Sequence, residues 1–492
     1  MTGSGFIGYF LAGAIPRLSM FAILFLLPRR ISMTETGLFV LAMTVGEILE
    51  MTSANWVRLF AQSREAGQRR LRPLRFGRLL VLAGAMLGIA LVLSIPVAWF
   101  VASDHIGAFI VAVFAYVLAF APLRLVLVIQ QVTHNSGLYA KIELTRGLMI
   151  LPAVIGATYL PNAGFLAPSL ALSGITLLAA LVGFAASRSQ FSAPRLIARG
   201  YRTPFQFGMP IVGDTLLNFV VVNFERFVLN AFLGPASVGV YAIAFALGRQ
   251  TVEFFIAPLN TMTVPVLFAT RAREGDERAR EIQSGISISI FILCAGALAG
   301  IILLRSQIAD LFVKPEFRAD TAWLMPVIAG STCLLMFKVF LYDNLFFMLG
   351  RNALKLKAVV PAAIVSAFGS VILVHAYGLP GAALSALLST TLALCASIFA
   401  TRTFFRFRLP LLEFGKITLI VLAASVALVL GVRVVAGAGS LAEFLAGFIA
   451  FSLAYGGGLA MLGISPLRLL KTPWEPYGVP VRQTISTRQA TV

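Results

Sequence analysis

Apolar runs of about 20 residues recur along the whole chain, separated by short breaks that carry charges or Gly and Pro. A helix of about 20 residues crosses the hydrocarbon core of a bilayer, which is about 30 Å thick. The composition agrees, because 59% of the 492 residues are hydrophobic and only 12% are charged, against roughly a quarter charged in soluble proteins. The sequence therefore predicts a protein that spans a membrane many times.

These runs predict an all-α polytopic fold with about 14 transmembrane helices. An open sheet would leave backbone groups unpaired in lipid, and a barrel would show short alternating strands instead of long apolar runs. The predicted spans are 5–28, 36–60, 79–101, 107–132, 145–160, 165–186, 207–229, 238–268, 285–304, 323–349, 358–374, 379–401, 414–436 and 441–464.

The 39 Lys and Arg residues lie mostly in alternate breaks between the spans. Arg146 is assigned to one such break, just before the span at 145–160 becomes strongly apolar. Positively charged breaks face the cytoplasm, so the pattern places both termini in the cytoplasm of a multi-pass plasma-membrane protein. The net charge of +19 is then a topology signal, and no nucleic-acid partner is expected.

Two segments of the chain are weakly similar to each other, the repeated phrase FLLPRRISMTETGLFVLAM at 25–43 and FVLNAFLGPASVGVYAIAF at 227–245. A shift of 202 positions brings Gly37 onto Gly239, and both copies fall at the junction between a first and a second helix. A second pair of segments, which end at Arg188 and at Arg402, is also similar in sequence. The repeat predicts two six-helix lobes related by an axis along the membrane normal, a design typical of transporters that bind substrate between repeats.

The predicted domains follow from this repeat. They are an N-lobe at 1–190 with helices 1–6, a C-lobe at 202–405 with helices 7–12, helices 13–14 at 413–464, and a cytoplasmic tail at 465–492.

Nothing in the breaks predicts an enzyme. They are too short for a soluble catalytic domain, and no Gly-rich phosphate-binding loop occurs, so ATP hydrolysis by this chain is not expected. The three histidines show no metal-ligand spacing. We therefore expect no catalytic residue, no metal and no cofactor.

The stretch NFERFVLNAFLGPASVGVYAIAF carries a recognisable pattern in Asn223, Glu225, Arg226, Gly239 and Tyr241. It resembles the seventh-to-eighth helix signature of the Wzx-type polysaccharide flippases of the multidrug/oligosaccharidyl-lipid/polysaccharide exporter superfamily. Glu225 stands where that signature more usually has Asp. The resemblance implies a bacterial inner-membrane flippase that moves an undecaprenyl-pyrophosphate-linked oligosaccharide by alternating access. Polysaccharide polymerases and glycosyltransferases are the candidate protein partners.

Four cations inside the spans are candidates for binding the anionic part of such a substrate: Arg17, Arg124, Arg226 and Lys338. An ionisable side chain at mid-bilayer costs roughly 2.5–3.5 kcal/mol on insertion scales, so it usually faces a cavity or a partner. A guanidinium matches phosphate oxygens in bidentate geometry. For Arg17, a structural pair with Glu47 or Glu50 of the next span is the alternative. For Lys338 the alternative is an internal network with nearby Tyr342 and Asp343, and for Arg226 it is a bridge between helices.

The remaining in-span charges have other interpretations. Glu47 and Glu50, three residues apart on one helix face, and Asp214 are candidates for coupling transport to a proton or sodium gradient. For the two glutamates, salt bridges to Arg17 and Arg58 are the structural alternative. Arg249 and Glu253 are spaced i,i+4, which favours a structural pair.

Other functions remain open at this point. A multidrug or cation antiporter and a peptidoglycan-precursor (lipid II) flippase share the architecture. The in-membrane arginines disfavour an organic cation as substrate, because like charge excludes it. An oligosaccharide polymerase or ligase usually needs a large outer loop, and the longest one here, near 305–322, is small.

Overall fold

The computed structural model describes residues 3–56, 58, 76–132, 135–161, 163–188, 202–407 and 409–464. Within these ranges the regular secondary structure is helical, without a strand, which confirms the predicted all-α fold class. Each of the predicted spans overlaps a helix, and among the described residues eleven helical stretches are long and apolar enough to cross a membrane. The count of fourteen spans stays a prediction. The predicted tail at 465–492 lies outside the described residues.

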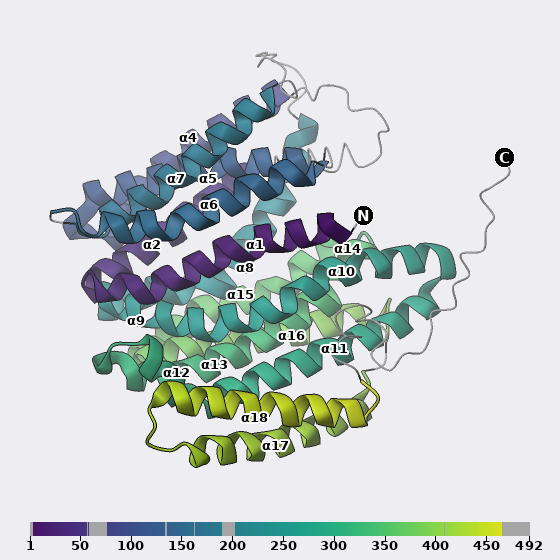
Figure 1. Ribbon diagram of the computed structural model, residues 1–492. Coiled ribbons are helices and arrows are strands. Elements are labelled where there is room, and N and C mark those ends of the chain that lie inside the picture. The colour runs from purple at the N-terminus through teal and green to yellow at the C-terminus, as the bar shows by residue number, and fades with distance from the viewer. Residues whose placement is uncertain are drawn as a thin grey trace. The chain divides into compact units, whose positions relative to one another are not determined.

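The chain divides into two compact units, of residues 1–246 with 363–386 and of residues 247–362 with 387–492. The lobes predicted from the repeat stay a prediction beside this division. The helices of the first half, shown from purple to teal in Figure 1, are α1 (Gly3–Leu26), α2 (Met33–Glu50), α4 (Phe76–Val101), α5 (Ile106–Val132), α6 (Ser136–Ala157), α7 (Leu166–Ala186), α8 (Arg202–Leu233) and α9 (Pro235–Phe245).

The second half continues from teal to yellow. Its helices are α10 (Thr251–Glu274), α11 (Asp276–Leu303), α12 (Arg305–Phe312), α13 (Arg318–Phe337), α14 (Asn344–Met348), α15 (Asn352–Tyr377), α16 (Leu379–Thr401), α17 (Leu411–Val434) and α18 (Ser440–Met461).

In the first unit, α1 packs along α6, and α2 packs along both α5 and α9. Ser19 ties α1 to α6, because its Oγ donates to the carbonyl oxygen of Gly147 at 2.7 Å. Gly147 has no room for a side chain, since a Cβ there would lie 2.8 Å from the backbone nitrogen of Pro16. The small residue therefore sets how closely these two helices approach.

The repeated phrase marks the contact between α2 and α9. A Cβ on Gly37 would lie 1.7 Å from the carbonyl oxygen of Pro235, and one on Gly239 would lie 2.8 Å from the carbonyl oxygen of Met33. The shift of 202 positions pairs Met33 with Pro235 and Gly37 with Gly239. Gly37 contacts Pro235 and Gly239 contacts Met33, and the same shift relates the two contacts. The two repeated segments therefore pack against each other in a nearly symmetric way.

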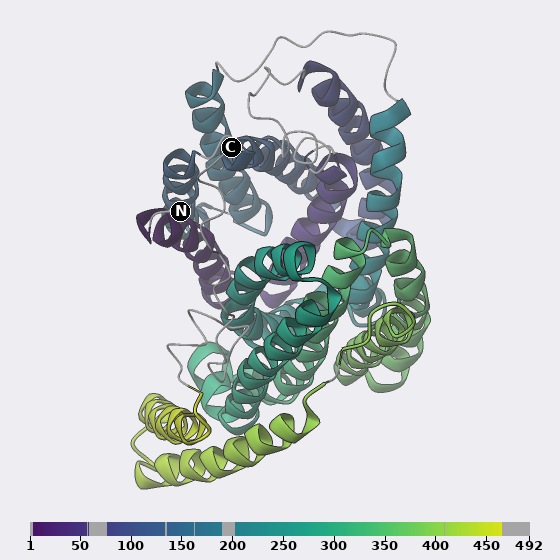
Figure 2. The same cartoon turned by 90° about the vertical axis from the view of Figure 1, so that its right-hand side faces the viewer.

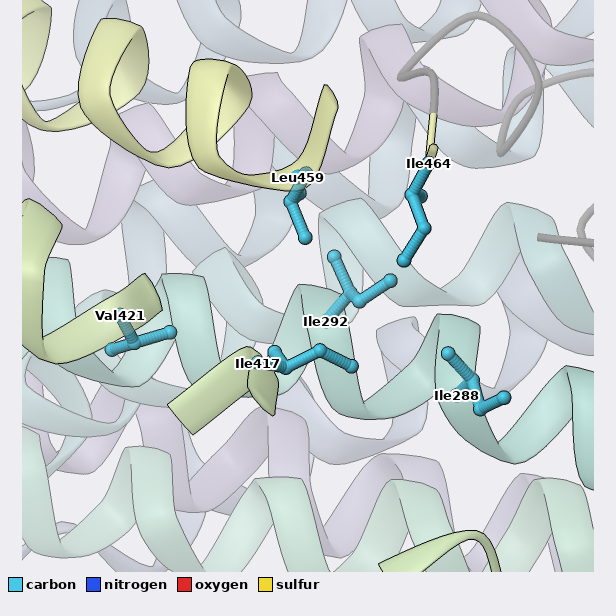
Figure 3. Packing of buried hydrophobic residues seen from close by; sticks show 6 residues of the cluster. All are labelled: Ile288, Ile292, Ile417, Val421, Leu459 and Ile464. Atoms are coloured by element: carbon cyan, nitrogen blue, oxygen red, sulfur yellow. The ribbon is translucent and has the colours of Figure 1, made fainter. Parts of the chain in front are cut away.

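In the second unit, α17 and α18 run side by side in both views (Figures 1 and 2) and pack on α11. Ile288 and Ile292 of α11 meet Ile417 of α17 and Leu459 of α18 in one buried apolar cluster (Figure 3). The outward sides of α17 and α18 carry many exposed leucines and valines, as expected of helices that face lipid.

Candidate functional site

Three spans are interrupted by π-helical turns in the described part of the chain: η2 (Met51–Asn55), η5 (Ala246–Gln250) and η7 (Lys338–Asp343). A π-helical turn is rare and is found frequently at functional sites. Charged side chains of the spans lie in or beside each of these turns. The turns therefore direct attention to three clusters of charge.

The first cluster centres on Glu50, the last residue of α2, whose side chain is fully buried. Its Oε1 accepts from Nη1 of Arg58, and its Oε2 accepts from Nη1 of Arg124 on α5. Asn55 supports Arg58, because its Oδ1 accepts from Nη2 of Arg58 at 3.1 Å. Both carboxylate oxygens are engaged by guanidinium groups, the strongest kind of hydrogen bond available to them.

Glu47 connects this cluster to the surface of the unit. Its Oε1 lies 3.5 Å from Nη2 of Arg124, and its side chain is 47% exposed. Arg124 is 27% exposed, and its guanidinium lies 5.6 Å from the centre of the Phe120 ring. The ring of Phe120 stacks in turn on Tyr116 at 4.0 Å. One arginine therefore neutralises both glutamates, and it does so at the edge of a buried network.

Arg17 lies elsewhere, with its side chain exposed near the middle of α1. The residues on either side of it, Pro16 and Ser19, are buried against α6. In the part of the chain that the structure describes, Arg17 makes no ion pair, and the oxygens of Glu50 are taken by Arg58 and Arg124. The alternative pairing of Arg17 with Glu47 or Glu50 is not the arrangement seen here.

Glu225 and Arg226 of α8 point to different neighbours. Glu225 is buried and accepts from the hydroxyl of Tyr241 on α9 at 3.2 Å. Nη1 of Arg226 donates to Oγ1 of Thr44 on α2 at 3.0 Å, and its guanidinium lies 4.4 Å from the centre of the Phe245 ring. The signature residues thus bridge α8 to α9 and to α2, which is the geometry of an interhelical link.

Asp214 is half-buried on α8, within the same unit. Its Oδ1 and its backbone carbonyl oxygen both accept from Nδ2 of Asn218, at 3.0 and 2.8 Å. The two side chains lie one turn apart on the same helix face, so they form a local polar pair.

The second unit holds the other two clusters. Lys338 is 1% exposed, and its Nζ donates to the carboxylate of Asp343 at 2.8 and 3.1 Å. Lys355 of α15 lies 3.9 Å from the same carboxylate. Beside η5, Nε of Arg249 lies 2.6 Å from Oε1 of Glu253. Lys338 is therefore part of an internal network in this structure, without access to the surface of its unit.

One buried pair was missed by the sequence reasoning. Arg146 donates to both carboxylate oxygens of Glu143, at 2.8 and 2.9 Å, and both side chains are buried in α6. The helix that holds this pair begins at Ser136, nine residues before the predicted span at 145–160. The i,i+3 spacing of opposite charges was the available signal.

Comparisons with known proteins identify a family and several related folds. Residues 26–314 match the family described as polysaccharide biosynthesis protein. The lipid II flippase MurJ in its inward closed conformation superposes with a TM-score of 0.71 at 11% identity, over 93% of this chain and 98% of MurJ. A mutant of the Vibrio cholerae MATE transporter VcmN gives a TM-score of 0.52 at 13% identity, over 80% of this chain and 94% of VcmN. No curated protein sequence matches significantly. The fold is thus that of MurJ and the MATE transporters.

Proposed function

The chain belongs to the family of polysaccharide biosynthesis proteins, and from this premise we propose that it translocates an undecaprenyl-pyrophosphate-linked oligosaccharide across the bacterial inner membrane by alternating access. The observation that carries the proposal is Arg17, an exposed guanidinium in the middle of a helix of high apolar content that makes no ion pair in the described part of the chain. Such a charge has to recover its insertion cost from water or from an anion. A pyrophosphate is an anion of the right kind.

The chemistry of Arg17 suits this substrate. A guanidinium presents parallel N–H groups that match two phosphate oxygens at once, and it keeps its charge at any physiological pH. The close packing of Pro16 and Ser19 on α6 fixes the backbone on both sides of Arg17. A positioned group loses less entropy on binding than a mobile one, which favours recognition of the substrate's charged end.

The cluster around Glu50 supplies a coupling device for the same transporter. Arg124 bridges the buried Glu50 and the half-exposed Glu47. Protonation of Glu47, or binding of sodium to it, would remove one of the two charges that hold Arg124. Arg124 would then be held by Glu50 alone, and its Nη2 edge would turn to the pyrophosphate, so a proton or sodium gradient would drive the cycle without ATP.

A cation antiporter of the same fold is less well supported by this geometry. An organic cation needs a carboxylate that is free to receive it. Glu50 is fully buried with both oxygens engaged, and Glu47 already faces Arg124. These carboxylates are therefore committed to arginines.

Substitution of Arg17 tests the proposal. Arg17→Lys should leave the protein at normal abundance in the membrane and lower polysaccharide export, because an ammonium keeps the charge and loses the bidentate fork. Arg17→Ala should abolish export and leave the lipid-linked precursor on the cytoplasmic leaflet. Arg249→Lys is the matched control, since Arg249 is paired with Glu253, and it should export normally.

A purely structural role of Arg17 gives a different result. Arg17→Ala would then lower the abundance of the protein, while export per folded molecule would stay at the wild-type level. Unchanged export per folded molecule would contradict substrate contact by Arg17.

A further inference from the structure

A basic and aromatic surface lies at one end of the second unit, where α14 joins α15 and α16 joins α17. We define the basic–aromatic surface by four exposed cations and three rings, which are Arg280, Arg351, Arg402, Arg406, Phe399, Phe404 and Phe405. The segment between α16 and α17 reads TRTFFRFRLP, with arginines and phenylalanines interleaved. The positive-inside pattern accounts for the sign of these charges but not for the phenylalanines interleaved with them.

Aromatic rings hold several of these cations in place. The guanidinium of Arg351 lies 4.5 Å from the centre of the Phe404 ring, and that of Arg280 lies 5.4 Å from the buried ring of Phe405. Arg402 lies 3.8 Å from the centre of the Phe399 ring. A ring below a guanidinium restricts its motion and leaves its N–H edges open to an anion.

The cations of this surface differ from their neighbours in pairing. Arg280, Arg351, Arg402 and Arg406 are exposed, and none of them makes an ion pair with a carboxylate among the described residues.

Nearby cations do have such partners. Arg271 pairs with Asp276, Arg278 with Glu274 and Glu281, and Lys416 with Glu413. Among the described residues, no carboxylate therefore compensates the positive charge of the basic–aromatic surface.

Apolar side chains project beside the cations. Leu411 and Leu412, which begin α17, are 71% and 74% exposed, and Phe399 is 61% exposed. Cations flanked by exposed leucine and phenylalanine at the end of apolar helices suit the boundary between acyl chains and headgroups, where aromatic residues concentrate.

We propose that the basic–aromatic surface binds the phosphate headgroups of anionic phospholipids in the cytoplasmic leaflet. The guanidiniums held on the phenylalanines receive the phosphates, and the exposed leucines lie against the first part of the acyl chains. Binding there anchors the second unit at a fixed depth through the start of α17. The proposal is independent of the transported substrate, because it concerns a surface apart from Arg17 and the Glu50 cluster.

The test compares two triple variants of the full-length protein that lose the same charge. Arg351→Gln with Arg402→Gln and Arg406→Gln removes unpaired cations, while Arg271→Gln with Arg278→Gln and Lys416→Gln removes paired ones. Binding of phosphatidylglycerol and of phosphatidylcholine to the detergent-purified protein is measured by native mass spectrometry. Each cation near an anionic surface contributes roughly a fivefold gain, so the first variant should bind phosphatidylglycerol about a hundredfold more weakly.

The control variant should lose no more than about threefold, and phosphatidylcholine should bind weakly to all forms. Equal losses in both triple variants would overturn the proposal, as would a wild type without preference for phosphatidylglycerol. Binding of inorganic pyrophosphate that the first variant loses, with no binding of phosphatidylglycerol, would also overturn it. If the first triple variant does not fold, Arg351→Gln and Arg402→Gln are tested singly, each with an expected loss of about fivefold.

Discussion

Two carboxylates, one in each unit, are held by two cations beside a π-helical turn, and their surroundings differ. Glu50 is held by two arginines, of which Arg124 is 27% exposed and also reaches the exposed Glu47. Asp343 is held by Lys338, which is 1% exposed, and by Lys355 at 3.9 Å. The network of the first unit is connected to the surface, and that of the second is closed.

The difference teaches where function can reside. A buried ion pair contributes little net stability, because desolvation offsets most of the attraction, yet losing one partner is costly. Loss of the central carboxylate should therefore destabilise the protein in the closed network and in the open one. Changes that alter charge without unfolding the protein should affect transport only in the open network of the first unit.

The largest effect is expected from Glu50→Gln. The change leaves Arg58 and Arg124 facing a neutral amide in a buried place, at a cost of about 3–5 kcal/mol. We expect a strong fall in membrane abundance and in the melting temperature of the purified protein. Glu47→Gln is the control and should change the melting temperature little, because Glu47 is half-exposed and makes one contact at 3.5 Å. Equal stability of the two variants would contradict the central place of Glu50.

Asp343→Asn should be the next in size, at about 3 kcal/mol, near the lower end of the cost of breaking a buried pair. Lys355 contributes less to this network because it is 3.9 Å away. The double variant Asp343→Leu with Lys338→Met should recover stability, since apolar residues of similar volume replace buried pairs at little cost. Its rate of transport per folded molecule should equal that of the wild type, and a large drop would show that the closed network takes part in transport.

A smaller effect on stability, below about 1 kcal/mol, is expected for Arg124→Lys, which keeps the charge beside Glu50. Transport should nevertheless fall about tenfold, because a single ammonium cannot bridge two carboxylates as the guanidinium fork does. The measurement is the export rate normalised to protein abundance. Normal export by this variant would remove Arg124 from the coupling device.

The smallest effect is expected for Arg249→Gln. The pair with Glu253 is an i,i+4 contact within one helix whose side chains are 20% and 33% exposed. Such pairs contribute roughly 0.3–0.5 kcal/mol, so melting temperature and export should both stay close to those of the wild type. A loss of export here would place the η5 cluster in the transport site.

Much of the fold could be predicted from the sequence, because insertion into lipid depends on local apolarity. The apolar runs located the helices, and the repeated phrase pointed to Gly37 and Gly239, which meet at the contact of α2 with α9. The Arg249–Glu253 contact followed from spacing alone. The family match covers residues 26–314 and so includes Glu225 and Arg226, which carry the Wzx-like signature.

The partners of the other charges could not be predicted in the same way. Glu50 and Arg124 are 74 positions apart, so their pairing depends on how α5 packs against α2. Arg146 was assigned to a break because helix α6 begins in a polar stretch, and apolarity alone places its start too late. Non-local packing and polar helix ends were thus the missing information.

The most direct test of the account is translocation by the purified chain in proteoliposomes. A fluorescent undecaprenyl-pyrophosphate-linked oligosaccharide in one leaflet, with an imposed proton or sodium gradient, should cross without ATP. Arg17→Ala should stop the crossing, and Arg249→Gln should not. Strict dependence on ATP, or crossing at the wild-type rate with Arg17→Ala, would contradict the account.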